Sequence, residues 1–264
     1  MNVTLRHHAS MRTAAVRLAA FAAATSVAAI GCRRDVSDLD SIFYSGGRRP
    51  VHCATNLDTK ANLSLADIDS ALNRAADRRE VVELYAHHPG ITVPVETIEY
   101  VLAGAAQRGL AFVTYADFTA GLDTGPGIAL SFDDTSVTAW HALLPAFARV
   151  GARVTFFVSR YAALQDSEHA LLHELAAAGH DVEPHTVHHY NGPAYVEENG
   201  VGAYLRDEIQ PSIDALTADG YQVHAFAYPF GARTSETDDA ILEHVPILRS
   251  ITFPNSTGST PCPL

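Results

Sequence analysis

Hydrophobic positions follow two alternating spacings along most of this chain, and the spacings predict alternating strands and helices. Short apolar runs, typical of buried strands, alternate with segments whose apolar residues recur every three or four positions, typical of helices. The predicted strands are 81–85, 110–115, 128–132, 154–158, 181–183 and 223–228. The predicted helices are 64–79, 95–107, 136–150, 168–178 and 204–218, the last with a kink at Pro211. Such alternation indicates a largely parallel sheet, open or closed into a barrel.

The first 31 residues have the pattern of an export signal. Three Arg residues precede the apolar run 18–30, which is followed by Gly31 and Cys32. A membrane-spanning helix needs about 20 apolar residues, so this run is too short to span. Ala29-Ile30-Gly31-Cys32 resembles a bacterial lipobox, in which the Cys is lipidated. We therefore expect residues 1–31 to be a signal peptide, and the protein to be exported, either as a cell-envelope lipoprotein held on the membrane through Cys32 or as a secreted protein.

The remaining chain divides into a tether and one domain. Residues 32–63 carry turn-forming residues without a sustained period, which predicts a linker. Ser64 with Asp67 three positions on is a start typical of a capped helix. Residues 64–264 are then the folded domain, and 47% hydrophobic content with 18% charge is ordinary for a globular protein.

The charge of the chain argues against one class of partner. Removal of residues 1–31 takes away three Arg and no acid, which moves the net charge from −12 to −15. So acidic a protein is a poor ligand for nucleic acid. After Cys32 the remaining cysteines are Cys53 and Cys262, and an exported compartment would permit a disulfide, although two separate thiols fit equally well.

Two adjacent carboxylates follow a predicted strand. Asp133 and Asp134 come directly after 128–132, where the carboxyl ends of parallel strands usually carry the chemistry. Because adjacent residues at a strand end can point differently, one could bind a metal while the other handles a proton. The alternative is that either Asp caps the helix that begins near Ser136.

Two histidines follow another predicted strand, 181–183. His185 and His189 are four apart, a spacing that brings both rings to one side of a helical turn. Two imidazoles and one carboxylate would leave a divalent metal with open positions for water and substrate. Because the chain has 14 His, a solvated or structural pair is the alternative.

Four segments resemble the polysaccharide deacetylase family with the NodB homology domain. Ser-Phe-Asp-Asp at 131–134 resembles its T/S-F-D-D motif, and His-Thr-Val-His-His at 185–189 its H-S/T-x-x-H motif. Thr-Phe-Phe at 155–157 resembles a family strand, and 225–231 resembles the third motif, R-x-P-Y/F-G. The resemblance covers roughly residues 81–252, and implies a distorted (β/α) barrel as the catalytic domain, either complete or incomplete at the C-terminus.

The resemblance also implies roles for these residues. Asp133 would be the general base, and Asp134, His185 and His189 would bind a divalent metal. The family holds the oxyanion with a backbone N–H in the third motif, which here is Pro229-Phe230-Gly231. Thr186 would steady the histidine loop. The donor set suits Zn first, with Co, Ni, Mn or Fe admissible.

The chain departs from the family at two places. Ala227 occupies the position where many members have an Arg that orients the base; Arg233 could substitute, although exposure to solvent is the alternative. The family's later motifs, including the strand-borne L-x-H whose His is the general acid, do not follow Leu248, and residues 249–264 contain no His. Three explanations stay open: the chain is truncated, His87 or His88 supplies the acid, or the protein binds without catalysis.

These observations favour a metal-dependent hydrolase that removes acetyl groups from an acetylated polysaccharide. One alternative is a catalytically impaired envelope lipoprotein that binds glycan and keeps the metal site. Another is an esterase or amidase that acts on a small substrate, because a metal and a base do not themselves specify a sugar.

Overall fold

Seven parallel strands form the centre of the protein in the computed structural model, which describes residues 1, 35–47, 49–119, 125–252 and 259–263. Their order in space is β7-β6-β5-β3-β2-β9-β8. The strands are β2 (Val51–Asn56), β3 (Val81–Ala86), β5 (Gly127–Asp134), β6 (Thr155–Val158), β7 (Asp181–Pro184), β8 (Ala225–Ala227) and β9 (Ile247–Ile251). Two short strands lie beside this path: β1 (Phe43–Tyr44) is antiparallel to β3, and β4 (Ala111–Phe112) is parallel to β5. Almost every strand residue on the path is buried, as expected of a parallel sheet covered on both faces.

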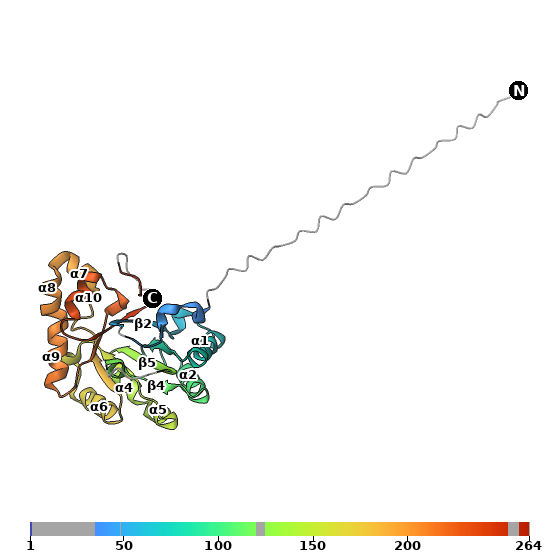
Figure 1. Ribbon diagram of the computed structural model, residues 1–264, viewed down its shortest axis with the longest axis horizontal. Coiled ribbons are helices and arrows are strands. Elements are labelled where there is room, and N and C mark those ends of the chain that lie inside the picture. Colours follow the sequence, from blue (N-terminus) through green and yellow to red (C-terminus); the bar gives the residue numbers. More distant parts are fainter. Residues whose placement is uncertain (2–34, 48, 120–124, 253–258, 264) are drawn as a thin grey trace. The chain divides into compact units, whose positions relative to one another are not determined.

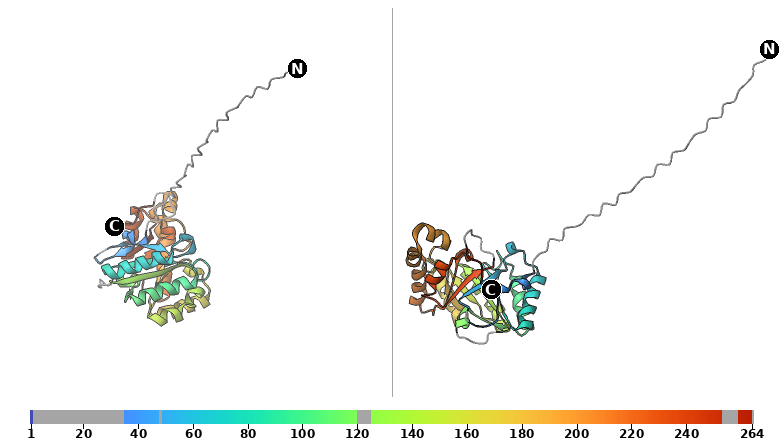
Figure 2. Two further views of the ribbon diagram at one scale, coloured as in Figure 1. Left: turned by 90° about the vertical axis from the view of Figure 1, so that its right-hand side faces the viewer. Right: turned by 45° about the horizontal axis from the view of Figure 1, so that its top comes forward.

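Helices surround this sheet (Figure 1, Figure 2). In the described residues they are α1 (Leu65–Arg78), α2 (Val95–Gln107), α3 (Tyr115–Thr119), α4 (Val137–His141), α5 (Leu144–Val150), α6 (Asp166–Ala177), α7 (Gly192–Asn199), α8 (Val201–Tyr204), α9 (Gln210–Ala218) and α10 (Ser235–Ile241). A π-helical turn, Leu205–Ile209, joins α8 to α9. The largest apolar core lies between α1, α2, α4, α5 and α6 and strands β3, β5 and β6, and a second core lies between α8, α10 and strands β8 and β9.

The sheet is nearly closed into a barrel, which confirms the predicted fold class. Its edge strands, β7 and β8, are joined by side chains. His185, directly after β7, donates from Nδ1 to the Ala227 carbonyl at 2.8 Å. The backbone N–H of His224, just before β8, donates to the carboxylate of Glu183 at 2.9 and 3.0 Å. The incomplete closure therefore lies between β7 and β8.

The predicted elements are largely confirmed, with two local differences. Ser64 and Asp67 form a capping box at the start of α1, as their spacing predicted. The single helix expected at 136–150 is two helices, α4 and α5. Pro145 explains the break, because a proline ring clashes with the carbonyl four residues earlier, here that of His141, where α4 ends. The strand expected at 110–115 is only Ala111–Phe112, and Tyr115 begins α3.

The prediction of a tether at 32–63 is wrong for the residues that the structure describes. β2 lies inside the sheet between β3 and β9, and Val51–Thr55 are buried. The pattern was missed because polar residues interrupt the strand. His52 is buried and its Nδ1 lies 2.9 Å from Glu83 Oε1 on β3, so a partner distant in sequence compensates for its burial.

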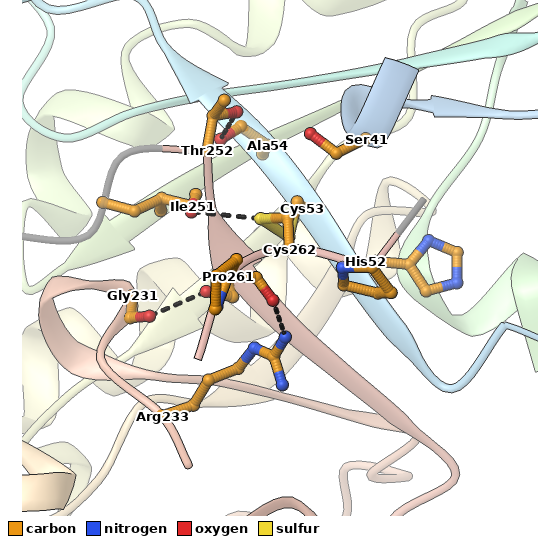
Figure 3. Close-up of a disulfide and its surroundings, with 12 residues drawn as sticks. Ser41, His52, Cys53, Ala54, Gly231, Arg233, Ile251, Thr252, Pro261 and Cys262 are labelled. Atoms are coloured by element: carbon orange, nitrogen blue, oxygen red, sulfur yellow. Dashed lines mark hydrogen bonds between the residues drawn. A yellow bond between two sulfur atoms is a disulfide. The ribbon is translucent and has the colours of Figure 1, made fainter. Parts of the chain in front are cut away.

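The sequence left open whether the barrel is incomplete at the C-terminus, and the described residues contain a strand there. β9 runs parallel to both β2 and β8 and completes this part of the barrel. Beyond it, Cys262 forms a disulfide with Cys53 of β2, which decides between the alternatives left open by the sequence. Figure 3 shows this disulfide next to Arg233, whose guanidinium donates to the Pro261 carbonyl.

The expected signal peptide, residues 1–31, and Cys32 lie outside the described residues, so cleavage and lipidation stay predictions. No helix among the described residues is long and apolar enough to cross a membrane.

Candidate metal centre

Three potential metal ligands meet at the carboxyl ends of β5 and β7. His189 Nε2 lies 3.1 Å from Asp134 Oδ1, His185 Nε2 lies 3.7 Å from the same oxygen, and the two Nε2 atoms are 3.2 Å apart. Tetrahedral coordination at about 2.0–2.1 Å places neighbouring ligand atoms about 3.3 Å apart. The observed spacing and the donor set, two nitrogens and one oxygen, therefore fit a divalent cation.

The backbone brings these side chains together through unusual conformations. Asp134, Thr186 and His189 have φ of 84°, 70° and 65°, in the left-handed region that residues other than glycine rarely adopt. The hydroxyl of buried Thr186 accepts the His189 N–H at 2.9 Å, as the predicted role of Thr186 requires. The expectation that a helical turn unites the two rings is wrong, because 185–189 is a loop. Such backbone strain is typical of functional sites.

The protonation states also suit a cation. His185 donates from Nδ1 to the Ala227 carbonyl, which leaves the Nε2 lone pair directed at the cluster. Burial lowers the pKa of His185 to about 4, so its ring is neutral at pH 7. Although burial opposes ionisation, the hydrogen bond from His189 and the charges of the surrounding histidines hold the pKa of Asp134 well below its usual range. The cluster therefore offers a carboxylate and a neutral imidazole.

The adjacent carboxylate, Asp133, has a different environment. It is 3% exposed, and Arg249 Nη2 donates to both of its oxygens at 2.5 Å. The Arg249 guanidinium, itself fully buried, also lies over the rings of Tyr85 and Phe157, 5.1 and 4.9 Å from their centroids. Asp133 and Asp134 thus separate into an ion-paired carboxylate and a candidate metal ligand.

Arg249 is a residue that sequence reasoning missed. It is the register partner of Ala227, where the family motif has Arg, so a cation from β9 replaces one from β8. The signal was present in the sequence, since an Arg in the middle of the apolar run 247–251 needs a buried partner. The suggested substitute, Arg233, does not fill this place. It is buried rather than exposed, and its guanidinium pairs with Asp238.

A histidine from β3's carboxyl end lies in the field of both carboxylates. His87 Nδ1 is 2.6 Å from Oδ2 of Asp58, which is 1% exposed on its side chain and also accepts the hydroxyl of Thr92. Burial lowers the pKa of His87, but the Asp58 hydrogen bond and the charges of Asp133, Asp58 and Asp134 outweigh it and raise the pKa. His88, the other candidate acid, directs Nδ1 to the Pro89 carbonyl instead. Of the two candidates, His87 is the one in the field of Asp133 and Asp134.

The third motif forms a tight turn beside the cluster. Phe230 has φ of 59°, is 47% exposed, and its ring centroid lies 4.8 Å from that of His189. Pro229 and Gly231 on either side are buried. A Cβ on Gly231 would lie 2.3 Å from Ile251 Cγ1, so only glycine fits between this turn and β9. The structure thus brings Phe230 to His189, one of the candidate metal ligands, while its role in oxyanion binding stays a prediction.

A second group with metal-ligand chemistry, Asp181, Glu183 and His224, lies at the other end of β7. Its acceptors are used within the protein: Asp181 accepts from Ala116 N and Thr155 Oγ1, and Glu183 accepts from His224 N. Burial raises the pKa of Asp181 to about 6 and that of Glu183 well above its usual value. Because these carboxylate oxygens already accept hydrogen bonds within the protein, we assign this group to the barrel interior.

Fold and site together define a (β/α)-barrel protein with two histidines and one carboxylate at the carboxyl ends of its strands. The family model described as polysaccharide deacetylase matches residues 121–244, a stretch that contains Asp133, Asp134, His185 and His189. Residues 121–244 therefore match the polysaccharide deacetylase family.

Two solved structures show the same fold. IcaB from Ammonifex degensii is 20% identical, with a TM-score of 0.53 over 69% of this chain and 88% of that one. A de-N-acetylase from Aggregatibacter actinomycetemcomitans is 13% identical, with a TM-score of 0.53 over 67% and 96%. No curated protein matches the chain in sequence. At these identities the structural likeness concerns the fold alone.

Proposed function

We propose that this protein is a metal-dependent deacetylase that removes acetyl groups from an N-acetylated or O-acetylated polysaccharide. The observation that carries the proposal is the meeting of three groups at one end of the barrel: the Asp134, His185 and His189 cluster, the Asp133–Arg249 ion pair, and the His87–Asp58 pair. Metal-assisted hydrolysis of an amide uses a Lewis acid, a base and an acid, and these groups would supply one of each.

The chain's own residues divide the reaction between them. Asp134, His185 and His189 would hold a divalent cation, with Zn the best fit to this donor set, which would polarise the acetyl carbonyl and lower the pKa of a water molecule. Asp133 accepts the proton of the attacking water, and Arg249 balances its charge and fixes its orientation. The backbone N–H of Phe230, in the turn shaped by Pro229 and Gly231, donates to the oxyanion.

His87 is the proton donor to the leaving amine in this proposal. Asp58 fixes the ring through Nδ1 and raises the pKa of His87, so the imidazole is protonated over a wider pH range than a free one. This arrangement supplies an acid from β3 where the sequence lacks the family's C-terminal histidine. The contacts of His87 support the explanation that an upstream His supplies the acid.

The proposed location is the exported side of the cell envelope. Residues 1–31 have the pattern of a signal peptide, and Cys32 would carry a lipid anchor. The Cys53–Cys262 disulfide supports an oxidising compartment, since such bonds are rare in the cytosol. A polysaccharide of the envelope is the substrate that such a protein would meet, and nucleic acid is not a partner.

The test is acetate release by the purified chain from N-acetylglucosamine oligomers and acetylated xylan, with and without added Zn²⁺ or Co²⁺. We expect metal-dependent release that Asp133→Asn and His185→Ala abolish, with the exposed Asp77→Asn and His244→Ala as matched controls. Bound metal without acetate release would favour the impaired, glycan-binding lipoprotein. Release from a small acyl ester but from no glycan would favour the small-substrate hydrolase.

A further inference from the structure

A pocket of about 740 Å³ lies between α7 and the π-helical turn Leu205–Ile209. Two of its lining residues, His188 and Tyr190, are the chain neighbours of the proposed ligand His189. The pocket therefore borders the loop that carries this ligand. A polymer with one unit at the metal centre has to continue along the surface beside that unit, and this pocket is a candidate place for a neighbouring sugar.

One wall of the pocket is aromatic and fixed. The ring of Tyr190, 48% exposed, stacks on Tyr195 with centroids 5.5 Å apart and on His188 with centroids 5.4 Å apart. On the other side of His189 lies Phe230, also exposed. Leu65 and Ile91 are the remaining large apolar residues exposed in 35–263, as far as the structure describes them. Both exposed aromatic rings thus flank one metal ligand, and exposed apolar surface in such a place marks a ligand groove.

The other wall is acidic. Glu198, Asp207 and Glu208 line the pocket against one base, Arg206. The Arg206 guanidinium donates two hydrogen bonds to the Asp207 carboxylate, with N–O distances of 2.8 and 2.7 Å. The Tyr195 hydroxyl donates to the same carboxylate. The carboxylate of buried Glu208 accepts hydrogen bonds from the backbone N–H and from Nδ1 of His188.

One carboxylate remains available at the mouth of the pocket. Glu198 is exposed and has no hydrogen bond or ion pair to another residue that the structure describes. With Arg206 neutralised by Asp207, the pocket carries net negative charge.

We propose that this pocket is a saccharide subsite for a glucosamine unit that has already lost its acetyl group. The inference rests on the proposed function, because deacetylation turns a neutral acetamide into an amine that is cationic at neutral pH. The exposed part of the Tyr190 ring, held in place by His188 and Tyr195, offers the apolar contact for the sugar ring, and Glu198 pairs with the ammonium group. The subsite therefore prefers polymer that is partly deacetylated, and directs the next cleavage to a unit beside an existing free amine.

The experiment compares binding of fully deacetylated glucosamine oligomers with N-acetylated oligomers of equal length to the metal-loaded chain, by calorimetry at low and high salt. We expect the deacetylated oligomers to bind more tightly at low salt, with the difference shrinking as salt rises. Glu198→Gln should weaken their binding about 3- to 10-fold, and the N-acetylated oligomers much less. Tyr190→Ala should weaken both. The matched control for Glu198→Gln is Glu197→Gln, because Glu197 is exposed on the same helix but lies outside the pocket. The matched control for Tyr190→Ala is Ile91→Ala, because Ile91 is an exposed apolar residue that does not line the pocket.

The subsite is overturned if Glu198→Gln and Glu197→Gln bind glucosamine oligomers equally well, or if those oligomers bind no better than N-acetylated ones at low salt. Acetate release is measured on the same samples. A chain that releases acetate but does not discriminate between the oligomers contradicts the subsite alone. A chain that discriminates through Glu198 but never releases acetate contradicts the proposed function alone.

Discussion

Arg249 stands opposite Ala227 in the parallel pairing of β8 and β9, and its guanidinium binds Asp133. The resemblance to the family had suggested that the base lacks its cation, because position 227 is Ala. Neighbouring strands place register partners side by side, so a long side chain on β9 reaches the same carboxylate. The barrel interior thus keeps the ion pair with the cation on a different strand.

Replacement of Arg249 by Met should therefore lower kcat/KM for deacetylation about 100-fold. It should also cost about 3 kcal/mol of stability, because it leaves the buried Asp133 without a partner. Arg149→Met, which removes an exposed ion pair with Glu99, should change both by little. Steady-state kinetics and urea unfolding measure the two effects.

A double variant separates the role of the charge from the identity of the strand. In Ala227→Arg/Arg249→Ala the guanidinium comes from the register partner, and the smaller residue at 249 leaves room for it. We expect this variant to recover part of the activity that Arg249→Ala loses. No recovery with intact folding would mean that Arg249 acts through its contacts with Tyr85 and Phe157 and not through Asp133.

The sequence predicted the elements and ligands whose signal is local. The apolar runs of β5 and β6 and the periodicity of α2 are visible in the sequence itself. The candidate site residues follow the ends of strands that the pattern predicts; they are Asp133, Asp134, His185 and His189. β2 and Arg249 could not be placed this way. His52 and Arg249 are polar residues in buried strands, and their burial is tolerated only because Glu83 and Asp133 lie beside them in the folded barrel.

The geometry of the histidine loop also could not be read from the sequence. A spacing of four residues favours a helical turn, but the loop instead uses left-handed conformations at Thr186 and His189. Thr and His do not indicate a left-handed conformation in a sequence, whereas a glycine would. The loop is held by tertiary contacts, among them the His185 bond to the Ala227 carbonyl from β8.

His87 should matter most when the leaving group is poor. An amine must be protonated to leave, whereas a phenoxide leaves without a proton donor. His87→Gln should therefore slow acetate release from an N-acetylated sugar about 100-fold, and release from an aryl acetate far less. Equal losses on both substrates would contradict the role of His87 as the acid. His88→Gln, whose ring is directed at the Pro89 carbonyl, is the matched control.

Asp58 should set the alkaline limit of activity. A general acid works while protonated, so activity should fall as pH rises through the pKa of His87, which Asp58 raises. Asp58→Asn removes that hydrogen-bonded charge, lowers the pKa of His87, and should move the alkaline limb of kcat/KM to lower pH. A limb that does not move in this variant would show that another group sets it.

Gly231 should be intolerant of any side chain. Its φ is 63°, and a Cβ would meet both Ile251 Cγ1 at 2.3 Å and Ile251 N at 2.8 Å. Gly109 has nearly the same φ, 66°, with nothing within 4 Å of a Cβ. Gly109→Ala should cost about 1 kcal/mol from the backbone alone, and Gly231→Ala about 1–3 kcal/mol more from overpacking. Equal unfolding free energies of the two variants would contradict the close approach of this turn to β9.

The Cys53–Cys262 disulfide should be a main source of stability for the barrel, because it ties the tail beyond β9 to β2 across a sequence separation of 209 residues. In the chain-entropy description a loop of this length contributes about 5 kcal/mol, and measured values are typically about 2–4 kcal/mol. Cys53→Ser, Cys262→Ser and the double variant should each lower the Tm by about 5–15 °C, and by the same amount, since each breaks one bond. A reductant should lower the Tm of the natural chain toward that of the double variant and leave the double variant unchanged. If the natural chain unfolds at the same temperature with and without reductant while its thiols become accessible, the bond holds the tail without stabilising the barrel.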